Sequence, residues 1–174
     1  PGEYKVVLSY LDKELFIDCE IIENPLFSLS NSEYESYHNF MTEAEKIYNE
    51  MTNLTNKDQV IKNEMVDFKS KINPSKEKNI LNEINSILNE IVKWDKIMVQ
   101  RLSKAYDDVE NFENGFTAHY LHLLNEVDSG IPKLTKGSKM KLIELNKQWK
   151  DYKKRAKRLI DSKINEFNIK YKKG

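Results

Sequence analysis

The last long stretch of the chain, residues 138–171, reads SKMKLIELNKQWKDYKKRAKRLIDSKINEFNIKY. Its apolar residues recur every three or four positions, which is the spacing of one face of an α-helix. They are Leu142, Leu145, Trp149, Tyr152, Ala156, Leu159 or Ile160, Ile164, Phe167 and Tyr171. At about 1.5 Å per residue such a helix spans about 50 Å. In a chain of 174 residues, a helix of this length buries its apolar stripe only beside other long helices, so we predict an elongated antiparallel bundle.

The same spacing predicts the rest of the bundle. Including the last helix, we expect helices over residues 31–53, 57–72, 76–127 and 137–171, which makes a mainly all-α fold of three or four long helices. The third stripe keeps heptad spacing, which is typical of coiled-coil packing, with one polar interruption at Asp95.

Three local signals qualify these boundaries. Ser30 and Glu33 have the spacing of a capping box, which favours a helix start at this point. The polar residues 53–58 either end the first helix or lie within a longer one. Gly115 interrupts the third segment, and we expect one long helix that bends or loosens there.

Residues 1–23 have a different pattern. Apolar side chains alternate with polar ones from Tyr4 to Ile22 on either side of residues 11–14, which predicts a β-hairpin. An isolated hairpin is marginally stable in water. We therefore expect it to pack on the helices of residues 24–174 in a single structural domain, or to pair with another chain.

Charge is balanced overall but separated along the chain. The 28 Lys and Arg match 28 Asp and Glu. Residues 133–174 hold 15 basic and four acidic residues, a net charge of +11, and residues 1–132 hold 13 and 24, a net charge of −11. The favoured interpretation is that the basic last helix neutralises acidic helices of its own bundle. The alternatives are binding to nucleic acid, to an anionic membrane or to an acidic partner.

Candidate metal ligands are few. The three His fall in two clusters, Glu35 with His38, and His119 with His122 and Glu126. A dinuclear bundle site needs two Glu-x-x-His pairs and two further carboxylates. With one such pair present, we predict no metal and no other cofactor.

Candidate catalytic groups are also weak. The one cysteine, Cys19, lies in the expected hairpin far from every His, so we expect a small buried thiol. The acidic run of Asp107, Asp108, Glu110 and Glu113 is expected on a solvated helix face. Only five Gly in the chain argue against a glycine-rich phosphate loop. We therefore predict that the protein is not an enzyme.

The aromatic residues fit a core. Trp94 and Trp149 lie on or beside the helical stripes, as do several Tyr. They lack the compact basic and aromatic motif of RNA-binding modules, so we interpret them as packing residues.

These observations favour a non-enzymatic helical-bundle module that binds another protein through an exposed helix face or a hairpin edge, and that forms part of a larger or surface-anchored protein. A homo-oligomer is a further expectation. The alternative is a binder of nucleic acid or anionic membrane through the Lys-rich last helix, and a metal-dependent bundle enzyme ranks third. The residues expected to contact a polyanion or partner are Lys150, Lys153, Lys154, Arg155, Lys157 and Arg158. Because the chain begins with Pro1 and Gly2 rather than Met, we expect its native start to be missing, which favours a surface location.

Overall fold

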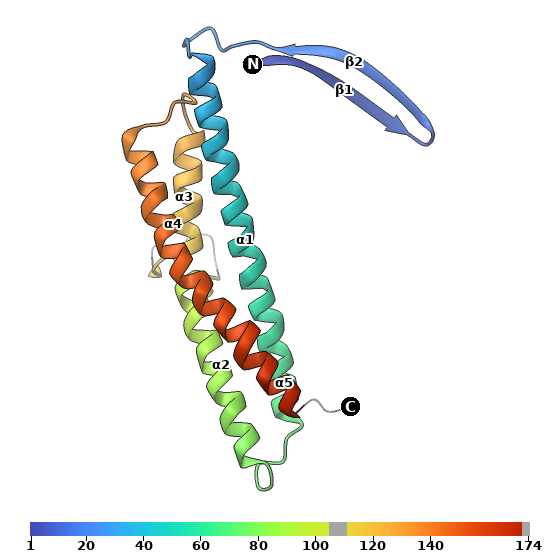
Figure 1. Ribbon diagram of the computed structural model, residues 1–174, viewed down its shortest axis with the longest axis vertical. Helices are drawn as coiled ribbons and strands as arrows, with labels where there is room; N and C mark the ends of the chain where they lie inside the picture. The colour runs from blue at the N-terminus through green and yellow to red at the C-terminus, as the bar shows by residue number, and fades with distance from the viewer. Residues whose placement is uncertain (105–110, 172–174) are drawn as a thin grey trace.

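The computed structural model describes residues 1–104 and 111–171. Its elements, in chain order, are β1 (Gly2–Tyr10), β2 (Lys13–Ile21), α1 (Asn31–Ser70), α2 (Lys78–Met98), α3 (Phe116–Asp128), α4 (Lys136–Lys157), the π-helical segment η2 (Arg158–Ile164) and α5 (Asn165–Tyr171). Figure 1 shows α1 and the continuous run from α4 to α5 extending along the molecule, with α2 beside their lower part and α3 beside their upper part. The predicted mainly α fold with an N-terminal hairpin is confirmed.

α1 is one helix of 40 residues. The predicted capping box is present at its N-terminus. The Glu33 N–H donates to Ser30 Oγ, and the Ser30 N–H donates to the Glu33 carboxylate at 2.9 Å. The main-chain donor of Ser30 and the nearby Lys133 lower the pKa of Glu33 to about 2. No break occurs near residues 53–58, where the Thr52 and Thr55 hydroxyls are satisfied by donating to carbonyls of the preceding turn. The two predicted helices 31–53 and 57–72 are therefore one.

The predicted helix over residues 76–127 is wrong. α2 ends at Met98 and α3 starts after Gly115, and the described residues between them are not α-helical. The two helices are stacked end to end. At their junction the Thr117 hydroxyl of α3 donates to the Met98 carbonyl of α2 at 2.8 Å. Buried residues of both helices, Met98 of α2 and Phe116 and Tyr120 of α3 among them, belong to one apolar cluster. Residues such as Leu102 lie in the connecting segment and are exposed.

The C-terminal helix follows the predicted range closely but changes pitch. Between α4 and α5 the seven residues of η2 form a π-helix, which is wider than an α-helix. Both Leu159 and Ile160 are buried there, whereas the α-helical pattern accommodates one or the other. Phe167 of α5, which follows in the same stripe, is also buried.

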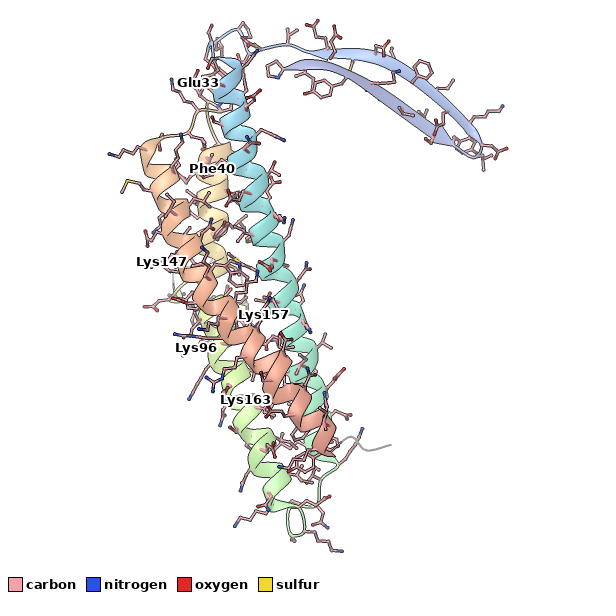
Figure 2. The ribbon with its side chains drawn as sticks, in the orientation of Figure 1. Glu33, Phe40, Lys96, Lys147, Lys157 and Lys163 are labelled. Atoms are coloured by element: carbon pink, nitrogen blue, oxygen red, sulfur yellow. The ribbon has the colours of Figure 1, made fainter. Side chains whose placement is uncertain are left out.

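The core consists of two apolar clusters. The upper one joins α1, the end of α2, α3 and α4, and includes Phe40, whose position on α1 is marked in Figure 2. The lower one joins α1, α2, η2 and α5. The predicted core aromatics Trp94 and Trp149 belong to the upper cluster, and each also makes a hydrogen bond, from Trp94 Nε1 to the Tyr152 carbonyl and from Trp149 Nε1 to Glu50.

The hairpin is separate from the helices. β1 and β2 pair antiparallel with Val6 opposite Ile17, and in the described part of the chain they contact only each other. Figure 1 shows the hairpin projecting away from the start of α1. The structure thus differs from the prediction that the hairpin packs on the bundle. The physical reason is that the helical stripes bury one another in the two clusters, so the bundle forms its core without the hairpin, although helical side chains such as Met140 and Ile143 stay exposed.

Candidate interaction surfaces

One face of the hairpin is almost entirely apolar. Strand register and the alternation of side chains place Val6 opposite Ile17 and Leu8 opposite Leu15 on the same face. Each of these four side chains is more than half exposed, and Leu15 reaches 70%. The full set on this face is Gly2, Tyr4, Val6, Leu8, Tyr10, Lys13, Leu15, Ile17, Cys19 and Ile21. An exposed apolar face of this kind is a mark of an interaction site.

The opposite face of the hairpin is mainly polar. The Ser9 hydroxyl donates to the Glu14 carboxylate at 3.2 Å, and the Lys5 ammonium lies 4.7 Å from the ring centre of Phe16. The sheet has only two strands, so each strand has one edge unpaired within the described residues. Cys19 is a free, exposed thiol, so the expectation that it is buried is wrong. Cys19 is exposed because no helix covers the face that carries it.

The hairpin tip is held in an unfavourable backbone conformation. Leu11 has a φ of 52°, in the left-handed region that favours glycine, and its side chain is 84% exposed. A glycine would form this turn without strain. The chain instead places a large apolar side chain at the tip of the hairpin, and within the described residues neither strand beside it contacts a helix.

The basic C-terminal helix is partly neutralised by the helices beside it. Lys153 pairs with Glu50 of α1 at 2.5 Å, Lys170 pairs with Glu83 of α2 at 2.9 Å, and Lys163 pairs with Glu90 of α2. In the loop before α4, Lys133 pairs with Glu33 at 2.9 Å. These contacts favour the interpretation that the basic segment balances acidic helices of the same molecule.

The six predicted contact residues do not form one surface. Lys153 and Lys157 line a groove of about 820 Å³ on the side of α1, and Figure 2 marks Lys157 there. Arg155 and Arg158 line a different groove, on the side of α2. Because a helix turns about 100° per residue, adjacent cations in the sequence point to different neighbours. The other two, Lys150 and Lys154, are exposed and lie outside both grooves.

A polar layer separates the two apolar clusters. Asp58 of α1 and Asp95 of α2 are buried, with 1% and 7% of their surfaces exposed. Arg101 binds Asp95 through two hydrogen bonds of 2.8 Å. Burial, and then the charge of Asp95, raises the pKa of Asp58 to about 7, opposed by Arg101 and Lys62. Asp58 Oδ2 has no hydrogen-bond partner among the described residues.

The sequence pattern did not predict this layer. The signal available was the polar residue Asp95 inside an apolar stripe. Asp58 gave no such signal, because it lies in a polar stretch of α1 and is buried only through the arrangement of the neighbouring helices.

The histidines lie at the surface. His119 and His122 are exposed and share a groove with Glu126, and His122 lies 4.0 Å from the Glu126 carboxylate. Glu35 and His38 are exposed on α1. Within residues 1–104 and 111–171, no three His, Cys, Asp or Glu side chains are grouped as metal ligands would be.

The predicted acidic run is only partly described. Asp107, Asp108 and Glu110 lie outside the described residues. Glu113 is exposed in the non-helical segment before α3, so its predicted place on a helix is wrong.

None of the helices in the described part of the chain has a stretch apolar enough, over sufficient length, to cross a bilayer. Comparison of the chain with protein-family models, with curated proteins and with solved structures gave no match.

Proposed function

We propose that this protein is a non-enzymatic interaction module, part of a larger or surface-anchored protein, that binds another protein through its N-terminal hairpin. The observation that carries the proposal is the apolar hairpin face, which is exposed along the full length of both strands and contacts no helix in the described structure. Burying a Leu or Ile side chain contributes about 1.5–3 kcal/mol. A partner that covers Leu8, Leu15 and Ile17 therefore gains several kcal/mol and also stabilises a marginal hairpin.

Two further features support this surface. The unpaired edges of β1 and β2 offer main-chain donors and acceptors to a strand of the partner. Leu11 at the tip is held at a φ of 52° although glycine would relieve the strain. A strained, exposed apolar residue suits insertion into a pocket of the partner, because strain of this kind persists where a function requires the side chain.

A photo-crosslinking experiment tests the proposal. A photoreactive amino acid replaces Leu15 on the apolar face, or Glu14 on the polar face, and the protein is irradiated with cells of its source organism. We expect a defined protein to be captured from position 15 and not from position 14. We also expect Leu8→Lys with Ile17→Lys to abolish the capture. Equal capture by the two positions, or capture that survives the double substitution, contradicts the proposal.

The tip is tested separately with Leu11→Gly. This substitution relaxes the turn but removes the side chain, so we expect a more stable hairpin that captures less of the partner. Unchanged capture would show that Leu11 does not enter the partner.

The alternative function is polyanion binding by the C-terminal helix. It is favoured by the net charge of +11 over residues 133–174 and opposed by the ion pairs that Lys153, Lys163 and Lys170 make with α1 and α2.

A further inference from the structure

A ladder of ion pairs joins the C-terminal helix to α2 and stops before its upper end. Lys170 pairs with Glu83, and the next pair, Lys163 with Glu90, lies seven residues further along α2 and seven residues back along the C-terminal helix. The next step of seven residues along α2 leads to Ile97, which carries no charge. Across from Ile97 lie Arg155 and Arg158. At this third step the two Arg side chains face an apolar residue of α2, whereas at each of the two lower steps a Lys faces a Glu of α2.

The end of the ladder is a groove of about 270 Å³ between α2 and the C-terminal helix. We call it the arginine groove. Trp94, Ile97 and Leu159 give it an apolar lining, and the remaining lining residues are Glu90, Lys93, Arg155, Arg158 and Lys163. Figure 2 marks Lys163 on the C-terminal helix and Lys96 on α2, the two helices that border the groove.

Within residues 1–104 and 111–171, the cations of the arginine groove lack a matching negative charge. Glu90 is the one carboxylate that these residues contribute to its lining, and it already pairs with Lys163. Arg155 and Arg158 are exposed and form no ion pair in the described part of the chain, and Arg155 lies 6.0 Å from the ring of Tyr152. Asp151 and Asp161, each within a turn of one Arg, pair with neither in that part. As far as the described residues go, the groove therefore presents two or three positive charges without an ion-pair partner, beside an apolar lining.

The use of arginine at these positions is specific. Only three of the 28 basic residues are Arg. One of them, Arg101, holds Asp95 through two hydrogen bonds, and the other two are Arg155 and Arg158. The planar guanidinium binds a carboxylate with two parallel hydrogen bonds and is more weakly hydrated than the Lys ammonium. Arginine is thus the better residue for binding a carboxylate against an apolar surface.

We propose that the arginine groove binds an acidic, partly apolar segment of a partner protein, whose carboxylates pair with Arg155 and Arg158 and whose apolar side chains contact Trp94 and Ile97. This inference is independent of the hairpin. A long polyanion fits less well, because Glu83 and Glu90 neutralise the ladder below the groove. The two Arg of the groove lie within about one helical turn of each other, whereas binding to nucleic acid relies on contacts with many successive phosphates.

The test uses the full chain and a labelled peptide of alternating Glu and Leu residues, with a Gln and Leu peptide as the neutral control. Binding is followed by anisotropy of the label and by the fluorescence of the tryptophans, one of which lines the groove. We expect the acidic peptide to bind at least about tenfold more tightly than the neutral one. Arg155→Gln with Arg158→Gln removes this preference. The control is Lys150→Gln with Lys154→Gln, which removes the same charge from the same helix but outside the groove. We expect this control to retain the preference for the acidic peptide.

A second variant introduces a carboxylate into the arginine groove itself. Ile97 is 38% exposed, so Ile97→Glu places a carboxylate beside Arg155 and Arg158 without opening the core. We expect this variant to bind the acidic peptide at least about tenfold more weakly, and Ile97→Gln to bind within about twofold of wild type. Circular dichroism confirms that each variant is folded.

Three results would overturn the inference. One is equal loss of binding in the Arg pair and the Lys pair of variants. Another is no effect of Ile97→Glu on binding. The third is tighter binding of single-stranded DNA or phosphatidylserine vesicles than of the acidic peptide, with the same dependence on Arg155 and Arg158, which would make the groove part of a polyanion site.

Discussion

Gly115 lies so close to Met98 that a Cβ atom on Gly115 would stand 2.5 Å from the Met98 carbonyl oxygen. The obstacle is main chain, which cannot rotate away as a side chain does. This approach allows α3 to start directly on the end of α2, where the Thr117 hydroxyl donates to the same carbonyl. A residue that resembles a flexible point in a long helix is thus a contact point between two helices.

Gly115→Ala is expected to destabilise the fold by about 1–3 kcal/mol, because the added methyl group separates α3 from α2. The matched control is Gly130→Ala. No atom lies within 4 Å of a Cβ at Gly130, so its effect is expected to be within about 0.5 kcal/mol. Urea unfolding of the three proteins measures both values. Equal stability of the two variants would show that α2 and α3 are not packed end to end.

Asp58→Asn is expected to change the pH dependence of stability. In the folded protein the pKa of Asp58 is about 7, above the value of 3.8 for an unperturbed Asp. Between these two pH values the folded state keeps a proton that the unfolded state loses, so the contribution of Asp58 to stability falls as pH rises from about 4 to 7. Asn cannot ionise, so we expect the variant to be about 1–3 kcal/mol more stable than wild type at pH 8 and about equally stable near pH 4.

Denaturant unfolding at a series of pH values measures this difference. Asp67→Asn is the control, because Asp67 is 66% exposed and pairs only with exposed Lys71. Its difference from wild type is expected to stay within about 0.5 kcal/mol at every pH. A pH-independent difference for Asp58→Asn would mean that Asp58 is ionised in the folded protein.

Deletion of residues 1–23 is expected to leave the helical bundle intact, because the strands contact only each other among the described residues. The deletion keeps Leu29, which is buried at the start of the helical part. We expect helical circular dichroism to persist and the melting temperature to change by less than about 3 °C. A cooperative loss of helix on deletion would place the hairpin in the core.

A peptide of residues 133–174 is expected to bind DNA or anionic vesicles at low salt. The whole protein is expected to bind them at least about tenfold more weakly, because Glu50, Glu83 and Glu90 neutralise part of the basic helix. Titrations at several salt concentrations compare the two. Equal affinities would favour the polyanion function over the protein-binding function.

Much of the local structure followed from the sequence by itself. The capping box of Ser30 and Glu33 and the period of the apolar stripes depend on residues within one or two turns of each other. The alternation that defines the hairpin is equally local, and it gave the two strands correctly. Both partners of such an interaction lie within a short stretch of sequence, so the pattern of that stretch is enough to predict it.

Tertiary structure decided the features that depend on distant residues. After the break at Met98, Gly115 closely approaches the Met98 carbonyl, and Asp58 is buried near the charges of Asp95 and Arg101, which come from a neighbouring helix and the segment after it. The exposure of the hairpin is also a tertiary feature, because it depends on whether a helix lies against the strands, and among the described residues none does. The cations left unpaired depend on how α2 and the C-terminal helix align and on the π-helical segment η2. A sequence pattern predicts that a helix has a basic face, but the partners of that face are set by the packing of the helices around it.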